Sequence, residues 1–138
     1  MIRCTGINAD LSAIPFSSEL ERRCGYALGA ADLLGQMAAH DYVEKLPTLF
    51  HEFEESNRFN GLSEGPTVFK NLEELMQRTP IFWEKYVKPK IERDFGGIHQ
   101  LLDDPAKNGR NAYIEAIEAN MRKLRALLGQ SFDPAAAC

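Results

Sequence analysis

The chain has 138 residues, which is enough for one domain that buries its own hydrophobic core. Its formal net charge of −4 argues against general nucleic-acid binding, which needs an excess of Lys and Arg, and no apolar run has the length that crosses a bilayer. Cys4, Cys24 and Cys138 are odd in number and lack the paired spacing of a zinc site. We therefore interpret them as reduced thiols in a cytoplasmic protein.

The first predicted helix follows an extended lead-in over residues 1–17. Ser18, with Glu21 three residues later, forms a capping signature for a helix that begins at about Ser18. One stripe of helical period gathers apolar residues, which predicts the buried side of this helix. The stripe consists of Leu20, Cys24, Ala27, Leu28, Ala31, Leu34 and Ala38.

A second helix is predicted to open at Asp41. This carboxylate can accept hydrogen bonds from exposed backbone amides, and Glu44 can reach back to complete a capping box. Pro47 removes one backbone donor, so it should kink or divide the helix. Turn signals that contain glycine mark a loop over residues 57–66.

The C-terminal half of the chain predicts further helices. In order, we expect a helix over 66–78, a helix from Thr79-Pro80 to Gly96-Gly97, a short helical turn over 98–102, and a last helix over 111–128. No segment has the alternating pattern that is typical of a strand.

These elements predict an all-α fold, in the form of an irregular bundle of about five helices. The bundle is expected to be a single helical domain over 1–138, with a frayed tail over 130–138. The expected core contains Leu28, Leu34, Leu46, Phe50, Phe53, Leu72, Leu75, Trp83, Val87, Ile117 and Leu124.

An acid lies beside the apolar stripe of the first helix. Asp32 shares one flank of that helix with Gly25, Gly29 and Gln36. Two glycines one turn apart allow another backbone to approach, so this flank is a candidate packing or interface patch. For Asp32 two interpretations stay open: a carboxylate hydrogen-bonded to a neighbouring helix end, or a ligand of a divalent metal ion.

Several segments carry a family resemblance. They are Tyr26-Ala-Leu-Gly-Ala-Ala-Asp-Leu-Leu-Gly-Gln-Met-Ala38, then Tyr42-Val-Glu-Lys-Leu46 and Phe50-His-Glu-Phe53, with a similar lead-in, Asn8-Ala-Asp-Leu-Ser-Ala-Ile-Pro-Phe16. Over about residues 8–53 the chain resembles the C-terminal half of a bacterial group of HD-domain metal-dependent phosphohydrolases. The resemblance implies a metal site made by a His, a His-Asp pair and a distant Asp, in that chain order.

Asp32 matches the last of these ligands, and the chain has no His before His40. The resemblance therefore implies a truncated domain that has one of the four ligands. A divalent metal ion held by a single carboxylate would keep mostly water ligands and bind weakly, so we expect the chain not to be catalytic by itself. A missing segment or a partner chain would complete the enzyme. No residue of this chain is predicted to be catalytic or to bind a cofactor.

Other polar clusters have simpler explanations. His40-Asp41 follows Asp32, so it is on the wrong side to be the His-Asp pair, and its Asp is already explained as a helix cap. His51 could share a metal ion with Glu55 one turn away, but such pairs are common on solvated helices. The aromatic and basic residues of 82–93 could stack on single-stranded nucleic acid and neutralise its phosphates. A helix with its aromatic side in the core and its lysine side exposed to solvent explains them as well.

Two functional classes remain open. One is a metal-dependent phosphohydrolase whose other ligands come from elsewhere, and the other is a non-catalytic helical interaction or scaffold module. In either class we expect the flank that contains Gly25, Gly29, Asp32 and Gln36 to be exposed or covered by a second copy. That expectation predicts a homodimer, or a partner that supplies the missing half. From the net charge and the lack of a long apolar run we expect no nucleic acid or membrane partner.

Overall fold

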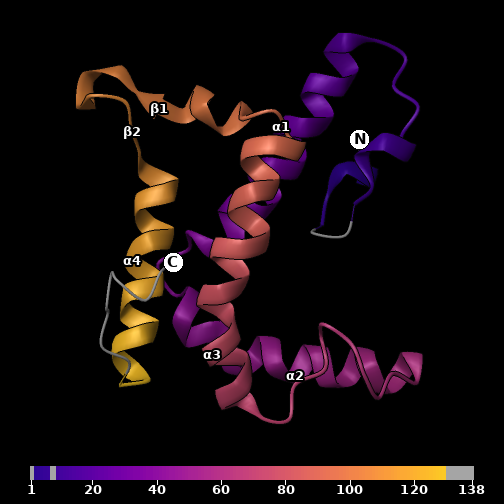
Figure 1. Ribbon diagram of the computed structural model, residues 1–138, viewed down its shortest axis with the longest axis vertical. Helices are drawn as coiled ribbons and strands as arrows, with labels where there is room; N and C mark the ends of the chain where they lie inside the picture. Colours follow the sequence, from indigo (N-terminus) through magenta and orange to yellow (C-terminus); the bar gives the residue numbers. More distant parts are fainter. Residues whose placement is uncertain (1, 7–8, 130–138) are drawn as a thin grey trace.

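The computed structural model describes residues 2–6 and 9–129 and shows a helical fold (Figure 1). Its α-helices are α1 (Glu19–Met37), α2 (Tyr42–Asn60), α3 (Leu72–Phe82) and α4 (Ala112–Leu127). Strands β1 (Asp103–Asp104) and β2 (Arg110–Asn111) pair antiparallel. The all-α fold class is confirmed, while the small hairpin contradicts the expectation that no strand forms.

Short helical turns connect these elements. The 3-10 turns are η1 (Ile2–Cys4), η2 (Leu11–Ala13), η5 (Ile98–Leu102) and η6 (Pro105–Lys107). The lead-in was predicted as extended, and its described part instead contains η1 and η2. The prediction of a helical turn over 98–102 is confirmed by η5.

The start of α1 follows from its capping residues. The Ser18 hydroxyl accepts a hydrogen bond from the amide of Glu21 at 3.1 Å, and the Glu21 carboxylate accepts one from the amide of Ser17 at 2.6 Å. These bonds satisfy two amides that have no partner inside the helix. The predicted start at Ser18 is confirmed, with the carboxylate reaching one residue further back than a standard capping box.

The predicted cap of α2 is wrong in its chemistry. Asp41 occupies the N-cap position, but its side chain makes no capping hydrogen bond with the described backbone; it pairs with Lys45 at 2.8 Å. Glu44 pairs with Lys123 of α4 instead of reaching back. The backbone of Asp41 is not extended (φ −104°, ψ 17°), whereas an N-cap that accepts from its helix usually is. Pro47 lies inside α2 and does not divide it.

The loop after α2 begins later than predicted. Residues up to Asn60 are helical, and Gly61 ends the helix in the left-handed conformation at φ 66°. Asn57 is buried, and its side chain donates to the carbonyl of Thr67 at 2.9 Å and accepts from the Thr67 hydroxyl at 3.1 Å. This side-chain pair, which no local pattern indicates, ties the end of α2 to the following loop.

The helix break predicted at Thr79-Pro80 does not occur. α3 begins at its cap Asn71, whose side chain accepts from the amide of Glu74, and continues through Pro80. The Thr79 hydroxyl donates to the carbonyl of Leu75 at 2.7 Å, so Thr79 extends a helix instead of capping a new one. The predicted third and fourth helices are therefore one rod.

The rod continues beyond α3 in two π-helical stretches, η3 (Trp83–Val87) and η4 (Lys90–Asp94), on either side of Pro89. Proline has no amide hydrogen, and widened turns of this kind accommodate such a gap. Gly96 and Gly97, with φ of 63° and 68°, end the rod as predicted.

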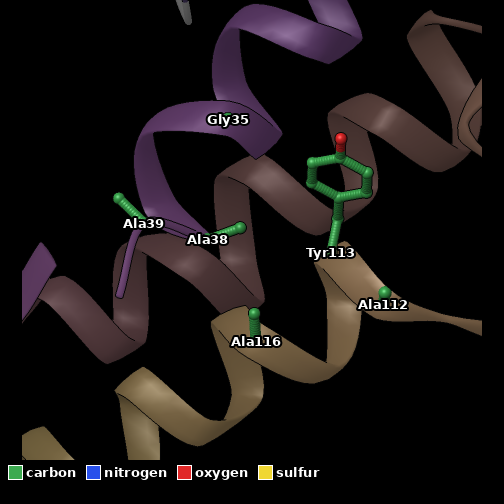
Figure 2. A pocket seen from close by; sticks show the side chains of 6 residues that line it. All are labelled: Gly35, Ala38, Ala39, Ala112, Tyr113 and Ala116. Carbon is green, nitrogen blue, oxygen red and sulfur yellow. The ribbon is translucent and has the colours of Figure 1, made fainter. Parts of the chain in front are cut away.

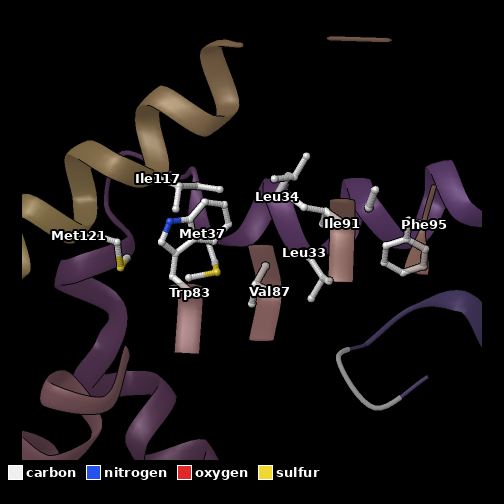
Figure 3. Packing of buried hydrophobic residues seen from close by; sticks show 10 residues of the cluster. Leu33, Leu34, Met37, Trp83, Val87, Ile91, Phe95, Ile117 and Met121 are labelled. Carbon is white, nitrogen blue, oxygen red and sulfur yellow. The ribbon is translucent and has the colours of Figure 1, made fainter. Parts of the chain in front are cut away.

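The main core lies where the rod, α1 and α4 meet (Figure 3). It contains Ala30, Leu33, Leu34, Met37, Trp83, Val87, Ile91, Phe95, Ile117 and Met121. A second cluster joins α2 to α4 through Val43, Leu46 and Leu124.

Most of the predicted core is confirmed, since Leu34, Leu46, Leu75, Trp83, Val87, Ile117 and Leu124 are buried. Phe50, Phe53 and Leu72 are half-buried, and Leu28, at 40% exposure, was placed wrongly.

The last helix agrees with its prediction within one residue at each end. Asn111 caps α4, and Gly129 follows it at φ 67°. The predicted frayed tail over 130–138, including Cys138, lies outside the described residues, as does Asn8. In the described part of the chain, no helix combines the length and apolarity needed to cross a membrane.

Candidate functional site

The side of α1 predicted to be buried is largely exposed. We call it the outer face and define it as Leu20, Cys24, Ala27, Leu28, Ala31 and Gly35, all of which are exposed. Leu20 is 72% exposed. The buried residues of α1 are instead Gly25, Gly29, Ala30, Leu33, Leu34 and Met37. The stripe that was predicted to be buried is therefore on the wrong side of the helix, and of its members only Leu34 is buried.

Two glycines explain why the other side of α1 is buried. A Cβ atom added at Gly25 would lie 2.7 Å from the sulfur of Cys4, and one at Gly29 would lie 2.6 Å from the Phe95 ring and overlap the carbonyl oxygen of Cys4. The N-terminal segment and the end of the rod thus pack directly on the backbone of α1. The expectation that both glycines are exposed or covered by a second copy is wrong, because their own chain covers them.

Asp32 ties the same segment to α1. Its carboxylate accepts a hydrogen bond from the amide of Gly6 at 3.3 Å and another from the exposed Gln36 side chain at 3.1 Å. A half-buried carboxylate with these partners stabilises the contact between the N-terminal segment and the helix. The hydrogen-bonded interpretation of Asp32 thus has its partners in place, although the main partner is a turn amide and not a helix end.

The other predicted polar residues do not join Asp32. His40 is exposed beyond the end of α1, and His51 is exposed on α2, where it contacts Glu54 at 3.2 Å and not Glu55. His99 has a buried Nδ1 atom without a hydrogen-bond partner among the described residues. Within residues 2–6 and 9–129, no group of three or more His, Cys, Asp or Glu side chains could hold a metal ion. The assignment of a metal to Asp32 stays a prediction.

A hollow of about 310 Å³ lies between the end of α1 and the first turns of α4. It is lined by Gly35, Ala38, Ala39, Ala112, Tyr113 and Ala116 (Figure 2). The Tyr113 ring stands beside the last turns of α1 and is 46% exposed. The hollow exists because five of its six lining residues are Gly or Ala, whose side chains are too small to fill the space between the helices.

Two asparagines fix the walls of the hollow. Asn120 of α4 is buried and donates to the carbonyls of Met37 and Ala39, both at 2.9 Å. Met37 ends α1, where a carbonyl has no partner inside the helix, and the Ala39 carbonyl also accepts from the amide of Tyr42 at 3.0 Å. Asn111 accepts from the amides of Tyr113 and Ile114 at the start of α4. The two helix ends that form the hollow are therefore held by side-chain hydrogen bonds.

Sequence reasoning found only part of this site. Asn111 stands at the start of the apolar run of the last helix, and an Asn in that position is a signal for a helix N-cap. Asn120 was not, because its partners lie 81 and 83 residues away and nothing in the local pattern identifies them. The hollow was missed because alanines at helical spacing are common and carry no functional signal alone.

Comparison with known proteins gives a family. A family model described as Npun_R2479-like matches residues 12–121. The chain belongs to this family. The match contains the whole outer face and all six residues of the hollow. No curated protein and no solved structure matches the chain. The resemblance to HD-domain phosphohydrolases stays a prediction.

Proposed function

We propose that the chain is a non-catalytic helical interaction module that binds an apolar helix through the outer face and the hollow. One observation carries this proposal: α1 is covered by its own chain on one side and presents six uncharged, apolar or small residues to solvent on the other. Contiguous exposed apolar surface of this kind marks interaction sites on folded proteins.

The shape of the surface favours a helix as the bound element. Ala27, Ala31 and Gly35 follow one another at four-residue spacing, so a second helix could approach the α1 backbone closely. Leu20 and Leu28 provide larger apolar contacts on the same face, and Tyr113 offers a ring at its end. Docking of an amphipathic helix by its apolar side is a common mode of recognition.

The enzymatic alternative has less support from the contacts of Asp32. A metal ion that activates water needs a fixed set of several ligands. Both oxygens of Asp32 already accept hydrogen bonds inside the chain, from Gly6 and Gln36. Among the described residues, no group of three or more His, Cys, Asp or Glu side chains that could hold a metal ion includes Asp32. From the interpretation of the cysteines as reduced thiols, we propose the cytoplasm as the location of the module.

Site-specific photo-cross-linking in cells tests this proposal. A benzophenone amino acid in place of Leu28 should give a discrete cross-linked product, and Ala31→Glu in the same chain should abolish it by placing a charge in the contact. The matched control carries the probe in place of Ile81, which is 52% exposed on α3 and outside the outer face. A product at position 28 that is no stronger than at position 81, or that survives Ala31→Glu, would contradict the proposal.

A further inference from the structure

The outer face has a protrusion near one end and a hollow at the other. Leu20, in the first turn of α1, is 72% exposed, and the hollow at the last turns of α1 is lined by small residues. At 3.6 residues per turn, Leu20, Ala27, Ala31, Gly35 and Ala38 lie within about 80° of one another around the helix. The protrusion, the small residues and the hollow therefore share one side of α1.

The protrusion and the hollow lie at nearly equal distances from Leu28 along the helix. The hollow is centred between Gly35 and Ala39, so it lies about 13 Å along the helix beyond Leu28, at 1.5 Å per residue. Leu20 lies about 12 Å before Leu28. A two-fold axis through Leu28 would place two copies of α1 antiparallel, with each Leu20 opposite the hollow of the other copy.

We infer that the helix bound by the outer face is α1 of a second copy of this chain, in an antiparallel two-fold dimer with Leu20 of each copy in the hollow of the other. This inference rests on the proposed function, because it names the partner of the same surface. A self-complementary patch is what a two-fold interface requires. The six residues that define the outer face are uncharged, so they oppose no like charges when the face pairs with itself, and the exposed Arg23 lies at its edge.

The partner's Leu20 would contact known groups in the hollow. A space of about 310 Å³ has room for the four carbons of a leucine side chain, and the alanines that line it offer apolar contacts. The half-exposed Tyr113 ring would cover that leucine from the α4 side. At the centre, the two Leu28 side chains, each 40% exposed, would meet near the axis.

The size of the surface sets the expected strength. A helix of 19 residues is about 28 Å long, and a strip about 10 Å wide along it covers about 280 Å². Stable interfaces bury about 800 Å² on each partner. The contact is therefore smaller than that of a permanent dimer, even with the first turns of α4 included. We expect a weak, reversible dimer that is detectable below millimolar chain concentration.

Sedimentation velocity of the purified chain over a range of concentrations measures the dimer. Leu20→Ser removes the protrusion, and Gly35→Leu occupies the hollow, where no heavy atom of the described residues lies within 4 Å of an added Cβ. Each should raise the Kd at least tenfold while circular dichroism shows an unchanged fold. Ile81→Ser, outside the outer face, should leave the Kd unchanged.

Disulfide cross-linking tests the arrangement. In a background of Cys24→Ser and Cys138→Ser, Leu28→Cys should form a dimer-sized product under mild oxidation, because the two copies of residue 28 meet at the axis. Leu20→Cys in the same background should not, because its two copies lie about 24 Å apart. Cross-linking of Leu20→Cys as strong as that of Leu28→Cys would overturn the antiparallel arrangement.

The two proposals fail in different ways. A chain that stays monomeric up to millimolar concentration, or a dimer that neither Leu20→Ser nor Gly35→Leu weakens, would overturn the inference. If the photo-probe at position 28 still gave a product of a mass other than twice the chain, the interaction module would stand with a different partner. Without any specific product at position 28, both proposals would be wrong.

Discussion

Replacing Gly29 by alanine tests the close packing that sets the orientation of α1. The added methyl group would lie 2.6 Å from the Phe95 ring and overlap the carbonyl oxygen of Cys4. The carbonyl belongs to the backbone and cannot rotate away like the end of a long side chain. Gly35→Ala is the matched control in the same helix, because the new methyl group would have no heavy atom of the described residues within 4 Å.

The expected changes in the free energy of unfolding have opposite signs. Alanine in place of glycine inside a helix stabilises by up to about 1 kcal/mol, because it restricts the unfolded chain. Gly35→Ala should show most of this gain. At Gly29 the same gain is offset by overpacking, which costs about 1–3 kcal/mol and more where backbone must move. We expect a net loss of about 1–2 kcal/mol for Gly29→Ala.

Urea unfolding followed by circular dichroism at 222 nm measures both changes. In thermal unfolding, the two variants should move the Tm in opposite directions by about 3–5 °C for each kcal/mol in a chain of this size. A Gly29→Ala protein as stable as the unmodified chain would show that the Cys4 segment does not pack on α1 as described. A destabilised Gly35→Ala would show that the hollow is occupied within the chain.

Three further predictions concern single side chains. Asn120→Ala should lower the free energy of unfolding by about 1–3 kcal/mol in the same urea assay, because the Met37 carbonyl loses its side-chain donor and the Ala39 carbonyl keeps only the amide of Tyr42; a change under about 0.5 kcal/mol would contradict it. Burial raises the pKa of Tyr42 to about 12, above its unfolded value of about 10, so stability should be complete below pH 10 and fall as the pH rises towards 12, whereas Tyr42→Phe should show a flatter profile in urea titrations. The chain alone should not hydrolyse an aryl phosphate with Mn²⁺; metal-dependent turnover that Asp32→Asn abolishes would refute this.

Local signals predicted the ends of several helices. The Ser18 cap, the pair Gly96-Gly97 and the last helix that begins after Asn111 all appear where expected, within one residue. Each depends on chemistry within a few residues, either a side chain that accepts from a nearby amide or a glycine that adopts positive φ. Such signals do not depend on what packs against the helix from elsewhere.

Which side of α1 is buried could not be predicted from such local signals. Counting apolar carbons favours the side with Leu20 and Leu28, because glycine contributes no side chain. Burial instead follows the glycines: Phe95 and the Cys4 segment approach the backbone at Gly29, and both come from distant parts of the sequence. A glycine on a helix is therefore evidence for close packing that a hydrophobic count misses.

The merged rod shows the same limit in another form. A Thr-Pro pair is a typical helix start, yet the Thr79 hydroxyl bonds back to Leu75 and the helix continues. Trp83, a few residues further on, is fully buried against α1 and α4 and donates to Glu118 at 3.0 Å. Burial of this large ring against distant helices outweighs the local preference for a break. The hollow likewise depends on a contact over long sequence separation, through Asn120.

The glycines of α1 differ in what offsets their cost to the helix. Gly25 and Gly29 each lose helix propensity of up to about 1 kcal/mol, and the packing of Cys4 and Phe95 on their backbone offsets it. Gly35 loses the same propensity, but no described part of its own chain uses the space it leaves. A second copy would use that space. Gly35→Ala should therefore raise the stability of the fold and weaken self-association several-fold, because the methyl group narrows the hollow. A variant that strengthened both would show that the hollow does not receive Leu20.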